Sequence, residues 1–237
     1  MDKALLLDFN INRPFQYFES FRKSLRDLGV ELTALSKDDL SKGLPESLKE
    51  KFEECKFIVL RKPFAVMSGE KMRAQVQEAV LSGKVGILVL FSFSEMDALV
   101  IMNQFLEPFN ITTSDFMVQD EDSNFKNTKK VVVFKPEAGA FKNEKLFQGV
   151  DEVVIPQPHH LFIQPPATPV LVGNPTSTAN RFYEDPAEQM NGEEIVVSAL
   201  NEENGRLLLV DSTMFTNEWI DLNTGFLKNV VNWVSEP

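Results

Sequence analysis

The C-terminal stretch, residues 205–234, constrains the fold more than any other part of the sequence. It begins with an apolar run at 207–210, which is typical of a strand buried on both faces of a sheet. Asp211 and Ser212 follow where that strand would reach the surface. Asn223 is a suitable N-cap for a closing helix. The apolar residues of this helix recur at helical spacing: Phe226, Leu227, Val230, Val231 and Val234. A strand followed by a helix that packs back on it indicates an α/β domain.

Strand and helix patterns alternate through the first half of the chain. This alternation predicts βαβ units and a mostly parallel sheet with helices on both faces. Predicted helices start near Asn12, Ser68 and Ser94, and Gly29 and Gly83 end the first two. The predicted strands are residues 5–9, 31–35, 57–60 and 85–91.

The pattern changes at about residue 111 to shorter strand-like pieces. We expect a β-rich extension over about 111–200, within one domain that spans 1–237. Five prolines between Pro156 and Pro169 predict an extended loop without regular pairing. The acidic residues 120–122 are predicted to form a solvated loop. The short predicted strands are 116–118, 131–134, 153–155, 161–163, 170–172 and 194–199.

Composition excludes several classes of protein. The 237 residues contain no apolar run of the ~18 residues that a membrane span needs, and no signal peptide is recognised. The single cysteine excludes an internal disulfide framework and predicts a reducing, cytoplasmic environment. A formal net charge of -11 opposes binding to nucleic acid or anionic lipid. The acidic surface favours a basic protein partner, with solubility alone as the alternative explanation of the charge.

Ligands of an open parallel sheet bind outside the carboxyl ends of its strands. Arg61 and Lys62 would precede a helix there, so that loop could receive a carboxylate or phosphate through charge and free backbone N–H groups. The alternative is that all these side chains are ordinary polar residues at strand ends. The predicted ligand- or partner-binding residues are Asn10, Asn12, Arg13, Arg61, Lys62, Ser92, Ser94, Asp211, Ser212 and Asn217.

The sequence argues against catalysis at the same edge. Ser92 is the one residue placed as a nucleophile elbow would place it, but phenylalanines flank it and no glycine permits a strained turn. His159 and His160 are adjacent, so they point to opposite sides of an extended chain, and we interpret them as surface or loop residues. Cys55 lies at the amino end of its strand, away from such a site. We therefore predict no catalytic residue, no metal site and no cofactor.

Three segments carry a resemblance to a known family. They are LLLDFNINRPFQYFESFRKSLRDLGVEL at the N-terminus, FIVLRKPFAVMSGEKM around the third strand, and GRLLLVDSTMFTNEWI near the C-terminus. Together with the fourth strand, their order and spacing resemble the GIFT domain. This domain occurs in an intraflagellar-transport subunit and, more distantly, in a non-catalytic subunit of oligosaccharyltransferase. It is itself similar to class I glutamine amidotransferases.

The resemblance implies a flavodoxin-like α/β domain that has lost the amidotransferase triad. An amidotransferase would present a cysteine between glycines near Ser92, and its histidine near the last strand is replaced here by Asp211, Ser212 and Thr213. The implied function is non-catalytic assembly with other subunits of a complex, which would be ciliary if the intraflagellar-transport resemblance holds. Two alternatives remain open: recognition of a small anionic or carbohydrate-like ligand, and a residual hydrolase or amidotransferase that uses Ser92.

Overall fold

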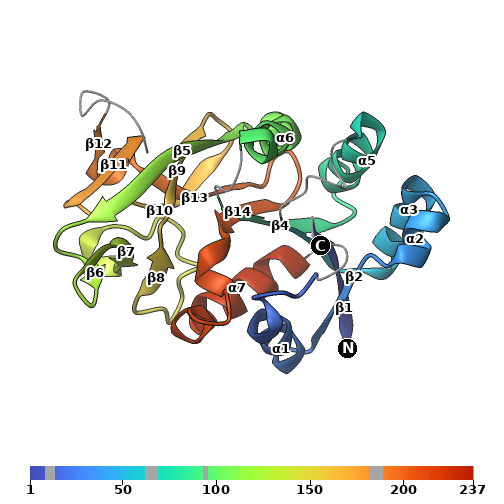
Figure 1. Cartoon of the computed structure of the whole chain (residues 1–237), viewed down its shortest axis with the longest axis horizontal. Helices are drawn as coiled ribbons and strands as arrows, with labels where there is room; N and C mark the ends of the chain where they lie inside the picture. Colours follow the sequence, from blue (N-terminus) through green and yellow to red (C-terminus); the bar gives the residue numbers. More distant parts are fainter. Residues whose placement is uncertain (9–13, 62–68, 93–95, 182–188, 237) are drawn as a thin grey trace.

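A computed structural model describes residues 1–8, 14–61, 69–92, 96–181 and 189–236. Its largest sheet has seven strands in the order β10-β13-β14-β4-β3-β1-β2 (Figure 1). The five strands from β14 to β2 pair in parallel, whereas β13 and β10 extend the sheet through antiparallel pairings. The strands are β1 Asp2–Asp8, β2 Val30–Ala34, β3 Phe57–Arg61, β4 Gly86–Phe91, β10 Thr168–Val172, β13 Val196–Asn201 and β14 Leu207–Asp211.

The predicted mostly parallel sheet is not confirmed, because parallel pairing is confined to these five strands. The other pairings within the described ranges are antiparallel. Strands β10 and β13 belong to the main sheet, although the sequence places both in the β-rich extension. Short apolar strands look alike in sequence whichever way their neighbours run, so periodicity could not give their direction. The structure is a mixed α/β fold.

Helices cover both faces of the main sheet, as predicted (Figure 1). Alternate residues of each strand point to opposite faces, which divides the core in two. Helices α1 and α7 pack with Leu6, Val59 and Leu88 on one face, and α3, α5 and α6 pack on the other. None of the described helices is long and apolar enough to cross a membrane. The helices are α1 Glu19–Asp27, α2 Lys37–Ser41, α3 Leu44–Glu54, α5 Glu70–Leu81, α6 Met96–Leu106 and α7 Thr224–Ser235, with short 3-10 helices η1 Glu107–Phe109, η2 Pro136–Ala138, η4 Gly192–Glu194, η5 Ser212–Phe215 and η6 Ile220–Asn223.

Helix α1 begins later than the sequence predicts. Residues 14–17 form turns, and Tyr17 has a φ of 66°, a left-handed conformation that a helix cannot contain. Gly29, with a φ of 83°, ends this segment as predicted. Asn12, Ser68 and Ser94, the three predicted helix starts, lie outside the described residues.

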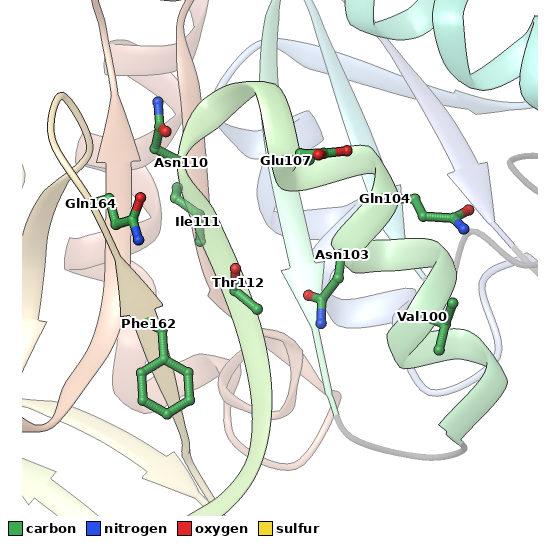
Figure 2. A pocket seen from close by; sticks show the side chains of 9 residues that line it. All are labelled: Val100, Asn103, Gln104, Glu107, Asn110, Ile111, Thr112, Phe162 and Gln164. Atoms are coloured by element: carbon green, nitrogen blue, oxygen red, sulfur yellow. The ribbon is translucent and has the colours of Figure 1, made fainter.

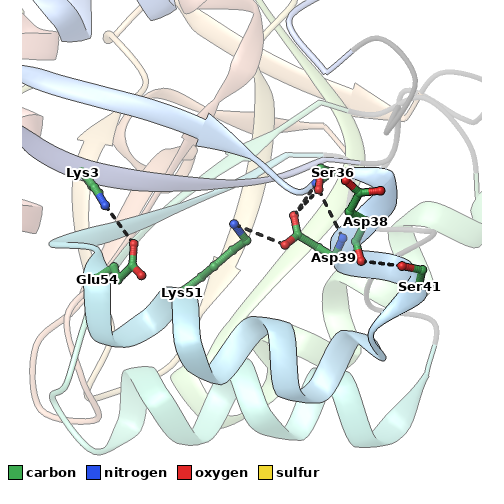
Figure 3. Close-up of polar contacts among 7 residues, drawn as sticks. All are labelled: Lys3, Ser36, Asp38, Asp39, Ser41, Lys51 and Glu54. Atoms are coloured by element: carbon green, nitrogen blue, oxygen red, sulfur yellow. Dashed lines mark hydrogen bonds and ion pairs between the residues drawn. The ribbon is translucent and has the colours of Figure 1, made fainter.

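The charged segment between β2 and β3 contains two helices, α2 and α3, which the sequence analysis did not predict (Figure 3). Asp39 accepts hydrogen bonds from the Ser36 backbone N–H at 2.6 Å and from the Ser36 hydroxyl at 2.7 Å. Its other carboxylate oxygen lies 3.4 Å from the Lys51 ammonium. An exposed ion pair of 2.8 Å joins Lys3 to Glu54. Charged residues here connect the two helices to each other and to β1.

The predicted β-rich extension forms two smaller antiparallel sheets, one of four strands in the order β12-β11-β5-β9 and one of three in the order β6-β7-β8. Three of these strands, β6, β11 and β12, were not predicted. Strands β6 and β12 have only two residues each, and β11 has no large apolar residue, so none of the three shows the apolar alternation that reveals a strand. The strands are β5 Ile111–Asp120, β6 Asn124–Phe125, β7 Thr128–Phe134, β8 Val153–Pro156, β9 His159–Ile163, β11 Ser177–Arg181 and β12 Met190–Asn191.

The proline-rich segment is not the unpaired loop that the sequence predicts. Strand β9 lies inside it and pairs antiparallel with β5. The prolines flank β9, whose own five residues contain none. Pro169 lies in β10, an edge strand of the main sheet, where a missing N–H donor is tolerated. The prediction of a loop was wrong because it rested on the number of prolines, whereas all of them lie outside the residues of β9.

The acidic stretch 120–122 is likewise not wholly solvated, because Asp120 is buried. Its carboxylate accepts hydrogen bonds from the hydroxyls of Thr176 and Ser177, both at 2.7 Å. It also accepts from the backbone N–H of Ser123 and from the Asn174 amide. Burial alone would raise the pKa of Asp120, but these hydrogen bonds outweigh it and lower the pKa. Asp120 thus ties β5 to the turn before β11.

Candidate functional site at the carboxyl edge of the sheet

A buried ion pair joins the carboxyl ends of β1 and β3. Asp8 and Arg61 are direct neighbours in the parallel register, and the guanidinium donates a hydrogen bond to the carboxylate. Arg61 also donates to the backbone carbonyl oxygens of Pro14 at 2.9 Å and Gln16 at 3.3 Å. Its guanidinium carbon lies 4.0 Å from the centre of the Phe18 ring. Arg61 therefore fastens the segment before α1 to the sheet.

This geometry changes the expected role of Arg61. The sequence suggests that its charge could receive a carboxylate or phosphate, but only 6% of the residue is exposed and its charge faces Asp8. An exogenous anion would have to displace an internal carboxylate. Lys62, the other cation of the predicted loop, lies outside the described residues. Asn10, Asn12 and Arg13 do so as well.

Asp211, at the end of β14, is the second buried acid of this edge. One carboxylate oxygen accepts from the backbone N–H of Thr213 at 2.9 Å and lies 2.7 Å from the Thr213 hydroxyl, so Asp211 caps the short helix η5. The other oxygen lies 3.4 Å from Nδ1 of His159. Ser212 begins η5 and is buried. The strand end, the 3-10 helix and β9 therefore meet at one carboxylate.

The two histidines are buried, which corrects their interpretation as surface or loop residues. They do point to opposite sides of β9, as extended backbone requires. His159 faces Asp211 and meets the Phe91 ring edge-on at 5.8 Å. His160 accepts a hydrogen bond at Nδ1 from the Val196 backbone N–H at 3.1 Å. Their burial was missed because the segment around them was predicted to be a loop.

The serines of the predicted site have different positions. Ser92 directly follows β4 and is half-buried. Its neighbour Phe91 is paired with Asp211 in the register of β4 and β14, so Ser92 and Asp211 lie at adjacent strand ends. Ser94 lies outside the described residues. The structure thus brings Ser92, Asp211 and Ser212 to one stretch of the carboxyl edge.

Asn217 connects this edge to α1. Its side-chain oxygen accepts the backbone N–H of Ser20 at 2.8 Å, and its own backbone N–H donates to the carbonyl oxygen of Tyr17 at 2.9 Å. Asn217 therefore supplies the acceptor that an N-cap side chain usually provides, although it lies 197 positions from Ser20 in the sequence. Phe18, the residue at the N-cap position, has no such acceptor. The Asn217 side chain thus stabilises the first turn of α1.

Sequence reasoning missed three contributors to this edge: Asp8, His159 and Thr213. Asp8 carried a usable signal, because an acid inside the apolar run of a buried strand needs a cationic partner. Thr213 directly follows Asp211 and Ser212, so its place at this edge was readable although it was not chosen as a site residue. His159 carried no signal, since only the fold brings β9 against the end of β14. Across the described ranges, no three His, Cys, Asp or Glu side chains come together to hold a metal ion.

Cys55 lies at the opposite end of β3, as predicted, and is partly buried. Burial raises the pKa of its thiol to about 11, from an ordinary value of 9.0. At pH 8 the thiolate would be about 100-fold rarer than in an unperturbed cysteine, and the greater nucleophilicity of a more basic thiolate restores roughly tenfold. We expect iodoacetamide to alkylate Cys55 of the folded protein about tenfold more slowly than the urea-unfolded protein. Equal alkylation rates of the folded and unfolded protein, measured by mass spectrometry, would contradict a buried Cys55 thiol with a raised pKa.

Comparisons with known proteins bear on the fold. No family profile and no curated protein sequence matches the chain. Among solved structures, the fold is similar to the "mmIFT52 N-terminal domain", with a TM-score of 0.71 and 17% sequence identity over 99% of this chain and 98% of that one. It is also similar to the glutaminase domain of Trypanosoma brucei CTPS with bound acivicin, with a TM-score of 0.50 and 10% identity over 100% of this chain and 95% of that one.

The resemblance to a GIFT domain is confirmed as a resemblance of fold. The glutaminase domain provides the expected, more distant likeness to glutamine amidotransferases. At 17% and 10% identity these likenesses concern architecture alone. The chain has a fold like that of the IFT52 N-terminal domain.

Proposed function

We propose that this chain is a non-catalytic protein-interaction module that assembles with other subunits of a larger complex. The observation that supports it most is the likeness in fold to the IFT52 N-terminal domain along nearly the whole chain. A mixed sheet with five parallel strands, in a chain without an amidotransferase cysteine near Ser92, fits this role. A cytoplasmic location, which the single cysteine favours, and a ciliary one, which the same likeness favours, are part of this proposal.

The chemistry of the carboxyl edge agrees with a structural function for its buried polar groups. Arg61 is held by Asp8 and by two backbone carbonyl oxygens, and Asp211 is held by Thr213. Groups committed to such contacts hold residues 14–16 and the start of η5 in place, and these segments can then present a fixed surface to a partner. The alternative of an anionic ligand loses support, because the charge of Arg61 is already used internally.

The glutaminase-like architecture leaves a residual hydrolase or amidotransferase as the competing function. Its nucleophile would be Ser92, next to the His159–Asp211 pair. Replacing Ser92 by alanine tests it directly: we expect glutamine and ester turnover by the purified protein to stay at the buffer rate before and after the change. A turnover that Ser92→Ala abolishes would overturn the non-catalytic assignment.

The assembly proposal is tested by affinity purification of the tagged protein from its native cell, with mass spectrometry of the proteins that come with it. We expect a stoichiometric set of partners. Charge reversal of Lys62, after β3, is expected to weaken the affinity of the direct partner at least tenfold, because it places an acid in the proposed docking loops. Binding is measured by titration of the isolated partner.

Lys84→Glu provides the matched control, because Lys84 is an exposed cation in the turn before β4, at the amino edge of the sheet. It makes the same change in net charge at the opposite end. If both variants bound equally well, the partner would not dock on the carboxyl edge. If no protein were recovered in stoichiometric amount, the assembly function itself would be wrong.

A further inference from the structure

Two asparagine–glycine pairs occur in the chain, Asn191–Gly192 and Asn204–Gly205. In such a pair the backbone nitrogen of the glycine can attack the side-chain carbonyl of the asparagine, because glycine has no Cβ that hinders the approach. Asparagine is accordingly one of the chemically labile residues of proteins. The attack needs an accessible amide and a backbone that can rotate into the right geometry, so the fold decides which pair reacts.

Asn191 belongs to the more accessible of the two pairs. It ends β12, a strand of only two residues at the edge of the four-stranded sheet (Figure 1). The residue is exposed, and its side-chain oxygen accepts a hydrogen bond from the exposed Gln189 amide at 2.7 Å. In the described part of the chain, its amide nitrogen has no hydrogen-bond partner. The group that would leave as ammonia is therefore unrestrained there.

The backbone at Asn191 can reach the geometry of attack through a small local opening. Asn191 is extended, with a φ of −137° and a ψ of 146°, so ψ must change before the Gly192 nitrogen meets the side-chain carbonyl carbon. This rotation disturbs the short pairing with β11, in which Asn191 lies opposite Thr178. Opening an edge strand of two residues costs far less free energy than global unfolding.

Asn204 is held by contacts that oppose the same motion. Its amide nitrogen donates to the carbonyl oxygen of Pro108 at 3.3 Å, in η1, the turn that connects α6 to β5 in Figure 2. Its backbone N–H donates to the side-chain oxygen of Asn201 at 2.8 Å. Gly205 packs so closely against α5 that a Cβ there would lie 2.3 Å from the carbonyl oxygen of Val80. Attack at Asn204 would have to break these contacts first.

We propose that Asn191 is a site of spontaneous deamidation, through which the folded protein acquires aspartate and isoaspartate at the end of β12. The Gly192 nitrogen forms a bond to the side-chain carbonyl carbon and gives up its proton, and the amide nitrogen leaves as ammonia. Water then opens the resulting cyclic imide. Opening at the side-chain carbonyl gives aspartate, and opening at the backbone carbonyl gives isoaspartate. This site goes beyond the proposed assembly function and does not depend on it.

The modification changes both the charge and the backbone of this turn. Each product carries a carboxylate in place of a neutral amide. Isoaspartate also inserts an additional carbon atom into the main chain just before η4, where space is limited: a Cβ on Gly173 would lie 2.4 Å from the Gly192 carbonyl oxygen. That oxygen accepts the Ile195 backbone N–H at 3.1 Å, directly before β13. Isoaspartate formation therefore disturbs the link between β12 and the main sheet.

The test is to incubate the purified full chain at pH 8 and to follow both asparagines by peptide mapping with mass spectrometry. In the folded protein we expect Asn191 to deamidate at least tenfold faster than Asn204, the internal control. In the urea-unfolded chain the two should react at similar rates, because both precede glycine and the contacts of Asn204 are gone. Asn191 reacting no faster than Asn204 in the folded protein would overturn the proposal. A tenfold difference that persisted in urea would assign it to the neighbouring sequence and overturn the role of the fold.

Asn191→Gln tests the location, because it keeps an exposed amide whose longer side chain closes the imide ring much more slowly. The aged proteins are treated with an isoaspartyl methyltransferase and labelled S-adenosylmethionine, which methylates the free carboxyl group of isoaspartate. We expect the natural chain to accept at least tenfold more methyl groups than Asn191→Gln. Equal methylation of the two would place the isoaspartate elsewhere in the chain and overturn the assignment to Asn191.

Discussion

Replacing Arg61 by methionine is expected to lower the free energy of unfolding by about 3–5 kcal/mol, the usual cost of removing one partner of a buried ion pair. The change removes the positive charge that faces Asp8, where both residues are at most 6% exposed. It also removes the two N–H donors that bond to the carbonyl oxygens of Pro14 and Gln16. Methionine keeps a comparable apolar stem, so the decrease in the free energy of unfolding measures the contribution of the Arg61 charge and its hydrogen bonds. Urea unfolding followed by circular dichroism measures it.

Two variants make this result interpretable. Lys23→Met breaks the exposed Lys23–Asp27 pair of α1, and we expect it to cost less than about 0.5 kcal/mol. The double change Asp8→Leu with Arg61→Met removes both buried charges, so it should be less destabilising than Arg61→Met alone. A single variant as stable as the natural chain would mean that Arg61 does not hold the segment before α1.

The same pair shows how far sequence can predict a site. The edge itself was predictable, because the carboxyl ends of parallel strands can be located from apolar runs. The sequence also places Arg61 and Asp211 correctly at that edge. It could not show that Arg61 faces Asp8, since the two are 53 positions apart and only the parallel register makes them neighbours. A cation that looks available in sequence is therefore committed to an internal contact in the fold.

The fold was predicted unevenly for a related reason. The parallel strands and the buried faces of α5 and α7 have clear periodicity, and the structure contains them close to the predicted bounds. Strand β11 has the sequence STANR, which no apolar pattern marks. It is held by pairing with β5 and β12, and its first residue bonds to the buried Asp120. Such strands depend on tertiary contacts, which a local pattern does not contain.

Acidification from pH 6.5 to 4 is expected to cost the protein about 3 kcal/mol of stability through His160. Burial lowers the pKa of this imidazole to about 4, from an ordinary value of 6.5. Its Nδ1 accepts the Val196 N–H, so a second proton would destroy that hydrogen bond and place a charge between the Phe116 and Phe162 rings. The unfolded chain binds the proton at pH values where the folded chain does not, and stability therefore falls as pH falls through this window.

His160→Asn separates this effect from general acid denaturation, because the asparagine oxygen can accept the Val196 N–H but does not titrate. Urea unfolding at several pH values between 7 and 4 should show a shallower loss of stability in this variant than in the natural chain. An unchanged slope in His160→Asn would assign the acid sensitivity to other groups, and Asp120, whose pKa is lowered because its hydrogen bonds outweigh its burial, would be the next to be tested.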